Sequence, residues 1–306
     1  MTNTLSYPIG TPGKPWREDE RNQWRVSQPQ QRHYQDDVVP RIMTLADRFE
    51  ILTYGQLGYA GEAYTLFALR NGNPEPSLAT ALVTGGVHGY ETSGVMGALQ
   101  FLETRANEYA GKINLLVAPC VSPWAYERVN RWNYDALDPN RNFAADSNVR
   151  ECAALMQLVA EQAGPYLLHI DLHETTDSDE SEFRPALAAR DGEEFEPGII
   201  PDGFYLVDDS ENPQPAFQAA IISAVEQVTH IAPPDDDGKI IGSPVVARGV
   251  INYPQAKYAM CSSLTGARFT TTTEVYPDSP RATPRICNDA QVAAVCAALD
   301  FALAHA

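Results

Sequence analysis

The chain has 306 residues, of which 44% are hydrophobic, and its 22 basic and 40 acidic side chains give a formal net charge of −18. This composition is typical of one large α/β domain or two small ones, and it excludes an intrinsically disordered chain. The excess of negative charge disfavours binding to nucleic acid and to anionic membrane surfaces, because both repel an acidic protein.

The N-terminus and the cysteines indicate the cellular compartment in which the protein is expected. The residues after Met1 lack the charged and then apolar pattern of a signal peptide, and no stretch approaches the roughly 18 apolar residues of a membrane span. Five cysteines without a Cys-x-x-Cys pair suggest neither a zinc ribbon nor a disulfide framework. We therefore expect a cytoplasmic protein with buried thiols and no membrane association.

The N-terminal part of the chain shows little periodicity. Residues 1–37 are rich in proline, glutamine and charged side chains, which predicts an irregular leader packed on the surface, followed by one folded domain over residues 38–306. A short helix is expected after Asp37, with Pro40 in its first turn. Residues 49–57 and 63–69 predict a hairpin-like pair of strands.

Apolar strands alternate with amphipathic helices in the rest of the chain. Strands are expected over residues 80–84, 113–118, 165–176, 203–208 and 270–277, helices over 92–104, 149–163, 215–228 and 288–304, and loops over 121–143, 177–182 and 231–249. This alternation predicts a single α/β domain with a central mixed, largely parallel β-sheet flanked by helices. Ligand sites in such sheets lie beyond the carboxyl ends of the strands.

A histidine and a glutamate lie where the strand 80–84 runs into the next helix. The strand is followed by Gly85 and Gly86, and then by His88 and Glu91. Imidazole and carboxylate both bind Zn²⁺, and two histidines with one glutamate and a water form an established catalytic zinc site. His-x-x-Glu pairs also arise by chance, so a surface turn with a solvated histidine is the alternative.

The strand 165–176 supplies a third candidate ligand. His169, Asp171 and His173 share one face of this strand, because side chains alternate with a period of two. His173 lies at the end of the strand and is the natural third ligand. His169 lies about 13 Å further back at the rise of a strand, so we expect it to be a hydrogen-bonded core histidine.

The expected loop 121–143 differs in composition from the rest of the chain. It holds three arginines and several asparagines in a protein that is otherwise acidic. Long loops inside a compact domain are usually functional, and arginine and asparagine side chains are good donors to a carboxylate. This loop is therefore a candidate anion receptor, although an ordinary loop tied by side-chain to backbone hydrogen bonds has the same composition.

Together these segments resemble the zinc metallocarboxypeptidases, the carboxypeptidase A-like family. The matching pieces are residues 86–91, Arg131-Trp132-Asn133, residues 138–143, residues 171–173 and residues 272–274. The resemblance extends from about residue 38 to the C-terminus. It implies a carboxypeptidase-like, phosphorylase/hydrolase-like fold.

The resemblance also implies a metal site. His88, Glu91 and His173 correspond to residues that hold one Zn²⁺ with an open position for water. Asp138 corresponds to the carboxylate that orients a ligand histidine. The cofactor implied is one zinc ion.

The remaining matches correspond to residues that act on the substrate. Glu274 corresponds to the general base, and Arg131 to the arginine that stabilises the oxyanion. Asn140 and Arg141 correspond to the pair that grips the terminal carboxylate of the substrate. The flap tyrosine of the family is best matched by Tyr253, with Tyr258 as the alternative.

The chain departs from the family pattern between the first two ligands, where Gly89 and Tyr90 replace an arginine of the digestive members, so the extended substrate contacts are expected to differ. The run 171–176 also resembles the aspartoacylase and succinylglutamate desuccinylase branch. Members of that branch carry a further β-rich domain after the glutamate, whereas a short stretch follows Glu274 here, which favours the peptidase.

The resemblance thus implies a zinc-dependent metallopeptidase, a carboxypeptidase that hydrolyses a C-terminal peptide or peptide-like amide bond. The alternative is a zinc-dependent N-acyl amino acid deacylase, and a third hypothesis is a catalytically silent zinc-binding or peptide-binding module. The expected partner is a peptide or an N-acyl amino acid with a free carboxylate.

Overall fold

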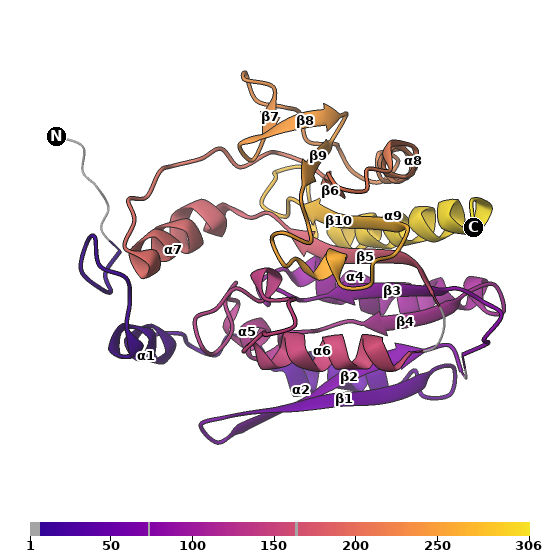
Figure 1. The fold of residues 1–306 in the computed structure, drawn as a ribbon, viewed down its shortest axis with the longest axis horizontal. Helices are drawn as coiled ribbons and strands as arrows, with labels where there is room; N and C mark the ends of the chain where they lie inside the picture. Colours follow the sequence, from indigo (N-terminus) through magenta and orange to yellow (C-terminus); the bar gives the residue numbers. More distant parts are fainter. Residues whose placement is uncertain (1–6, 73, 163–164) are drawn as a thin grey trace.

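The computed structural model describes residues 7–72, 74–162 and 165–306. The strands of these residues form one sheet in the order β1-β2-β4-β3-β5-β10-β6-β9-β8-β7 (Figure 1). In chain order they are β1 Glu50–Tyr59, β2 Glu62–Arg70, β3 Thr80–Gly85, β4 Asn114–Ala118, β5 Tyr166–Glu174, β6 Tyr205–Asp209, β7 Lys239–Ile240, β8 Ser243–Ala247, β9 Val250–Tyr253 and β10 Phe269–Val275.

The centre of the sheet is parallel and its outer parts are mostly antiparallel. β4, β3, β5 and β10 run in the same direction, whereas β1 and β2 form an antiparallel hairpin and β6 pairs antiparallel with β10. The predicted mixed sheet with a parallel centre is confirmed. Because β3, β5 and β10 are parallel, their carboxyl ends meet at one edge of the sheet, and Glu274 lies in register with His173.

Helices cover both faces of the sheet. Those of the described residues are α1 Glu18–Val26, α2 Tyr34–Asp37, α3 Val39–Met43, α4 Thr92–Thr104, α5 Pro123–Arg128, α6 Arg150–Glu161, α7 Arg184–Asp191, α8 Pro215–Val225 and α9 Pro284–Ala304, with the short turns η1 Ala106–Tyr109, η2 Pro139–Arg141, η3 Asp179–Phe183 and η4 Cys261–Ser263. Figure 1 shows α6 in front of the sheet and α4 and α9 behind it.

The alternation of side chains along β3 explains how both faces of the sheet are buried. Leu82 belongs to the cluster packed against α6, whereas Ala81 and Val83 belong to the cluster that contains residues of α4 and α9. All residues of β3 and β4 are buried. Continuous apolar runs such as these are typical of parallel strands covered on both faces.

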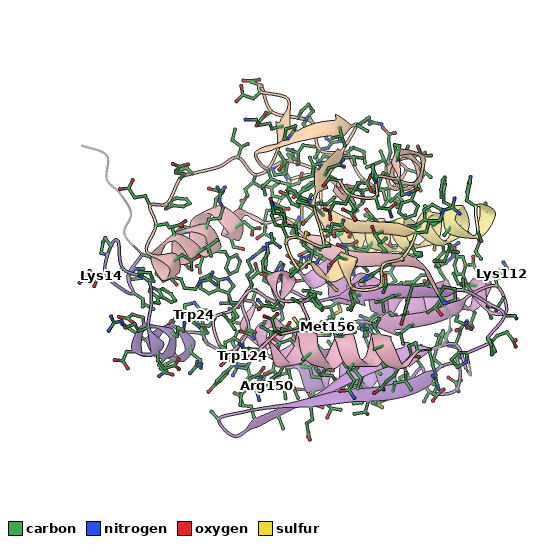
Figure 2. The ribbon with its side chains drawn as sticks, in the orientation of Figure 1. Lys14, Trp24, Lys112, Trp124, Arg150 and Met156 are labelled. Atoms are coloured by element: carbon green, nitrogen blue, oxygen red, sulfur yellow. The ribbon has the colours of Figure 1, made fainter. Side chains whose placement is uncertain are left out.

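The leader is more ordered than the sequence predicted. Within residues 7–37, α1 and α2 replace the expected irregular chain, and Trp16, Trp24 and Tyr34 are buried in the main core. The Trp24 ring lies 6.1 Å from the Trp124 ring of α5 (Figure 2). The prediction failed because single aromatic anchors, not an apolar period, hold this segment. Residues 1–6 of the predicted leader lie outside the described residues.

Glu127 of α5 joins the leader to the domain. Its carboxylate accepts hydrogen bonds from the Tyr34 backbone N–H (2.9 Å), from the Gln30 amide (3.0 Å) and from the Tyr64 hydroxyl (2.8 Å). Its backbone carbonyl accepts two more from the N–H groups of residues 31 and 32. The glutamate side chain is 7% exposed, so these contacts replace the water that it loses.

Three predicted loops contain regular structure. The segment 121–143 includes α5 and η2, the segment 177–182 runs into η3 and α7, and the segment 231–249 includes β7 and β8. These elements are short and are held by contacts with distant parts of the chain, so they lack the periodicity on which the prediction relied. The helix expected over 149–163 ends at Glu161, and residue 163 lies outside the described residues.

The last helix corrects the expectation about membrane spans. By length and composition α9 could cross a membrane, with a mean hydropathy of 1.4, and it is the single helix of the described residues that meets this test. Of the 18-residue stretch of α9 that passes this test, 56% is buried inside the fold, and the helix packs against α4 and α8. This burial is typical of the core helix of an α/β domain.

Candidate metal centre

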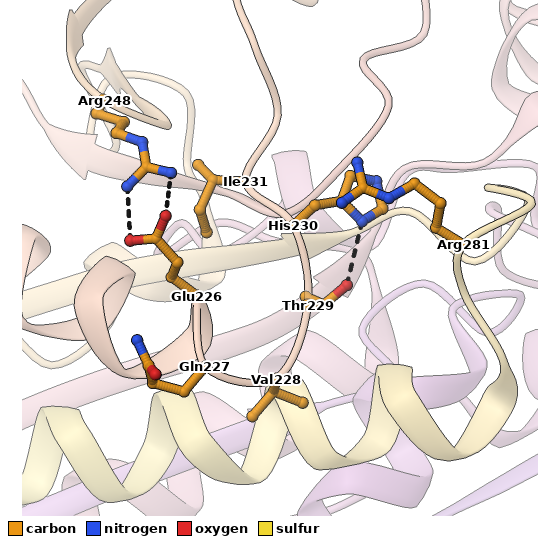
Figure 3. A pocket seen from close by; sticks show the side chains of 8 residues that line it. All are labelled: Glu226, Gln227, Val228, Thr229, His230, Ile231, Arg248 and Arg281. Atoms are coloured by element: carbon orange, nitrogen blue, oxygen red, sulfur yellow. Dashed lines mark hydrogen bonds and ion pairs between the residues drawn. The ribbon is translucent and has the colours of Figure 1, made fainter.

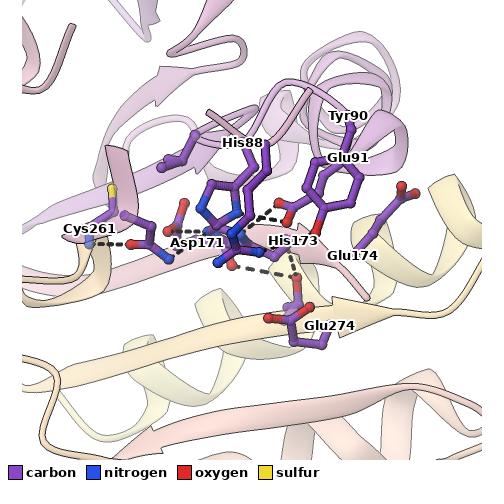
Figure 4. Close-up of polar contacts among 12 residues, drawn as sticks. His88, Tyr90, Glu91, Asp171, His173, Glu174, Cys261 and Glu274 are labelled. Carbon is purple, nitrogen blue, oxygen red and sulfur yellow. Dashed lines mark hydrogen bonds and ion pairs between the residues drawn. The ribbon is translucent and has the colours of Figure 1, made fainter. Parts of the chain in front are cut away.

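His88, Glu91 and His173 meet at the carboxyl edge of the central strands. His88 Nδ1 lies 2.8 Å from Glu91 Oε1, and His173 Nδ1 lies 2.7 Å from Glu91 Oε2. One ligand atom from each of the three lies within 4.8 Å of the others, and all three side chains are buried (Figure 4). The structure therefore brings together the three residues that the sequence predicted as ligands.

The turn that carries His88 and Glu91 is packed tightly against α5. A Cβ at Gly89 would lie 2.0 Å from the carbonyl carbon of Ala125 and 2.0 Å from the amide nitrogen of Tyr126, so no other residue fits there. Gly86 adopts a φ of +62°, a conformation that glycine adopts without strain. These two glycines let the chain leave β3 sharply and place His88 over the sheet edge.

Each histidine of this cluster also contacts an aspartate through its other ring nitrogen. His88 Nε2 lies 2.8 Å from Asp138 Oδ1, and His173 Nε2 lies 2.6 Å from Asp171 Oδ2. An aspartate on the outer nitrogen fixes the orientation of the ring and favours metal binding by the inner nitrogen. The orienting position of Asp171 was not predicted, although the Asp-x-His spacing on one strand face was a signal for it.

The charged groups of this cluster stabilise one another. Burial alone would raise the pKa of Glu91, but His173 and His88 lower it to about 2. Burial alone would lower the pKa of His173, but Asp171 and Glu91 raise it well above its usual value. Glu91 Oε2 is buried and faces His173 Nδ1 at 2.7 Å. Two imidazole nitrogens and such a carboxylate form a donor set that fits Zn²⁺.

Glu274 of β10 lies next to this cluster. Its carboxylate accepts a hydrogen bond from the Thr175 hydroxyl (2.9 Å), which in turn contacts the Tyr205 hydroxyl at 2.7 Å. Burial, with the negative charge of Glu91, raises the pKa of Glu274 to about 8. A carboxylate with a pKa near neutrality can both take up and release a proton.

Arg131 and His88 share Asp138 as a partner. Arg131 Nε donates to Asp138 Oδ2 (3.1 Å), and its Nη1 donates to the Tyr90 hydroxyl (3.2 Å) and lies 3.5 Å from Asp179 Oδ1. Asp179 belongs to the acidic run 177–182, whose charges we expected to be solvated. It is instead buried, because η3 turns it toward Tyr90 and Arg131.

The two residues expected to grip a carboxylate differ in their surroundings. Asn140 is buried, with its Oδ1 accepting from the Cys261 N–H (2.8 Å) and its Nδ2 3.5 Å from His173 Nε2. Arg141 is exposed and takes part in none of the ion pairs of the described residues. Its guanidinium lies 6.0 Å from the Tyr258 ring.

The two candidate flap tyrosines lie side by side, with ring centroids 6.0 Å apart. The Tyr253 hydroxyl accepts a hydrogen bond from Ser243 of β8 (3.3 Å). Tyr258 is 42% exposed and lies beside Arg141. The assignment of Tyr253 as the flap residue stays a prediction, and Tyr258 is the tyrosine nearer to Arg141 by these contacts.

His169 is a core residue, as expected. It is fully buried, and its Nε2 lies 3.1 Å from the Thr84 hydroxyl. Burial lowers its pKa to about 4, although the charge of Asp171 opposes this shift. It takes no part in the ligand cluster.

We expect His169 to make stability fall as the pH drops. Its ordinary pKa of 6.5 applies to the unfolded chain, and its folded pKa is about 4. Between these values the unfolded chain binds a proton that the folded protein does not, so the free energy of unfolding decreases by up to about 1.4 kcal/mol per pH unit and levels off below both pKa values. Urea unfolding at pH 7, 6 and 5 measures this dependence.

His169→Gln is the matched variant, because glutamine can still contact Thr84 but does not titrate. The difference in unfolding free energy between wild type and variant should shrink from pH 7 to pH 5. Parallel pH profiles of the two proteins would show that His169 makes no such contribution.

An open pocket of about 450 Å³ lies elsewhere in the fold and is lined by residues 226–231, Arg248 and Arg281 (Figure 3). Its charged groups are largely paired, since Glu226 binds Arg248 through both oxygens and His230 lies 2.8 Å from Asp202. None of the predicted site residues lines it.

No family model matches this chain, and no curated protein matches it. Several solved structures match this chain. A proposed metallopeptidase from Shewanella denitrificans OS217 superposes with a TM-score of 0.65 at 18% identity, over 87% of this chain and 89% of the other. The chain has a metallocarboxypeptidase-like fold. A proposed metallopeptidase from Shewanella amazonensis SB2B gives a TM-score of 0.64 at 22% identity, over 87% of this chain and 93% of the other.

A metallo-carboxypeptidase from Pseudomonas aeruginosa, solved in complex with (2-guanidinoethylmercapto)succinic acid, gives a TM-score of 0.55 at 15% identity. The match covers 94% of this chain and 70% of the other. At these identities the comparisons show the metallocarboxypeptidase-like fold. The chemistry of the site must be argued from its own residues.

Proposed function

We propose that this protein is a zinc-dependent metallocarboxypeptidase that hydrolyses a C-terminal peptide or peptide-like amide bond. The observation that carries the proposal is the His88, Glu91 and His173 cluster, with an aspartate behind each histidine and Glu274 at its side. The metallopeptidase-like fold of the solved neighbours supports it.

The three clustered residues would hold the metal. His88 and His173 would bind through the Nδ1 atoms that now face Glu91, and Asp138 and Asp171 would keep both rings in place. A bound Zn²⁺ supplies Lewis-acid activation of water and of the scissile carbonyl group.

Glu274 would act as the general base. It takes a proton from the attacking water and later delivers it to the nitrogen of the leaving amine, so that the carboxylate is regenerated at the end of the cycle. The Thr175 hydroxyl holds Glu274 Oε2 at 2.9 Å, which leaves Oε1 free for this proton transfer.

Two arginines would meet the negative charges of the reaction. Arg131 lies beside His88, where its guanidinium can donate to the oxyanion that forms when water adds to the carbonyl. Arg141 is exposed and lacks an ion-pair partner among the described residues, so it is available to bind the terminal carboxylate of a substrate. The ligand of the Pseudomonas aeruginosa neighbour, a succinic acid derivative, supports a carboxylate-bearing substrate.

The experiment that tests the proposal compares three substrate classes with the zinc-loaded protein. These are peptides with a free C-terminus, the same peptides as C-terminal amides, and N-acetyl or N-succinyl amino acids. Release of the last amino acid from the free peptides, but not from the amides, supports a carboxypeptidase. Cleavage of the N-acyl amino acids alone would support a deacylase instead of a carboxypeptidase. If the zinc-loaded protein cleaves none of the substrates, a catalytically silent binding module is favoured.

A further inference from the structure

Asp179 is a buried acid that the proposed reaction does not use. Its side chain is 10% exposed, although it belongs to an acidic run in the sequence. Its carboxylate accepts hydrogen bonds from the Tyr90 hydroxyl (2.9 and 3.1 Å), from the Thr176 backbone N–H (2.8 Å) and from the Thr176 hydroxyl (3.5 Å). The same carboxylate lies 3.5 Å from Arg131 Nη1. Burying a carboxylate costs free energy unless such partners compensate it.

Among the described residues, partners contact two of the three guanidinium nitrogens of Arg131. Nε donates to Asp138, and Nη1 is shared between the Tyr90 hydroxyl and Asp179. No contact of the described residues engages Nη2, and the arginine side chain is 22% exposed. A guanidinium held at two of its three nitrogens presents the third in a fixed direction, because the group is planar and rigid.

The residues of this network come from three segments around the metal ligands. Tyr90 lies between His88 and Glu91, and its ring packs on Phe183 of η3 at 4.6 Å between centroids. η3 follows shortly after the strand that carries His173, and Arg131 comes from the segment after α5. Asp179 thus ties the arginine to both parts of the chain that supply the ligands.

We propose that Asp179 is a positioning residue, which holds Arg131 by Nη1 so that Nη2 is the donor presented to the oxyanion. This role rests on the proposed function. Tyr90 assists, because its hydroxyl donates to Asp179 and accepts from Arg131. The acid and the tyrosine therefore fix the direction of the arginine rather than contact the substrate.

The test is Asp179→Asn, in which an amide replaces the carboxylate that attracts Arg131. We expect kcat to fall by about 10-fold or more with KM changed less than about twofold, because an interaction made in the transition state is impaired and substrate binding is not. Glu182→Gln is the control. It removes the same charge from the same short turn, at an exposed position, and should leave both constants unchanged.

A second measurement needs no substrate. The Arg131 Nε–H signal in a ¹H–¹⁵N spectrum, assigned by its loss in Arg131→Lys, should shift in Asp179→Asn and stay in place in Glu182→Gln. If Asp179→Asn does not fold, Tyr90→Phe takes its place, since it removes the hydroxyl that joins Asp179 to Arg131.

The two measurements separate this proposal from the proposed function. A wild-type protein that cleaves no peptide contradicts the proposed function, while the Arg131 signal still reports whether Asp179 holds the arginine. An unchanged signal in Asp179→Asn, or an unchanged kcat, overturns the positioning role.

Discussion

Replacing Glu274 with glutamine is expected to abolish turnover while zinc stays bound. Glutamine keeps the size of the side chain and can still accept a hydrogen bond from Thr175, but it cannot take a proton from water. Removal of a general base typically costs about 10²- to 10⁴-fold in rate, so kcat should fall by roughly that factor. The measurement is kcat on a cleaved peptide together with the zinc content of the same preparation.

The control for this variant is Glu211→Gln, which changes an exposed glutamate beyond the end of β6. It should have the kcat and the zinc content of the wild type. Undiminished activity of Glu274→Gln would remove Glu274 from the mechanism. Loss of zinc in Glu274→Gln would instead give this residue a part in holding the metal.

Replacing His173 with alanine is expected to remove the metal. The substitution takes away one of three ligands and leaves Asp171 without the imidazole it contacts at 2.6 Å. Loss of a residue that merely orients a ligand typically costs about 10- to 100-fold in metal affinity, so loss of the ligand itself should cost at least about 100-fold. Metal analysis should find one zinc ion per chain in the wild type and none in the variant.

The matched control is His169→Gln on the same strand face, which should keep its zinc because His169 lies outside the cluster. Zinc retained in His173→Ala would mean that the three residues do not form the site. Zinc lost equally in both variants would mean that damage to β5, and not loss of a ligand, releases the metal.

The sequence predicted the parts of the site that depend on local pattern. The strand, glycine turn and helix around His88 and Glu91 follow from an apolar run and a helical period, and the α4 bounds were predicted to the residue. His173 followed from the period of two in β5. Its distance from Glu91 could not be predicted, because it depends on the pairing of β3 with β5.

The parts that were missed depend on contacts between distant segments. The side chain of Asp179 is predicted from the sequence to be solvated, because nothing near it in sequence shows that it contacts Tyr90 and Arg131. Asp171 was placed on the correct strand face, but its role behind His173 required the side-chain geometry. The leader is predicted to be irregular because Trp24 is the one buried residue of α1, and a single buried residue produces no helical period in the sequence.

The contacts of Glu127 mean that the first segment of the chain belongs to the same folding unit as the metal centre. Glu127 lies in α5, and the backbone of α5 at Ala125 and Tyr126 is the surface against which Gly89 is packed. A protein shortened to residues 38–306 would lose the Tyr34 and Gln30 donors to this buried carboxylate. We therefore expect that cutting at the apparent domain boundary loosens the helix that supports the turn with His88 and Glu91, and that it weakens the proposed metal site from a distance.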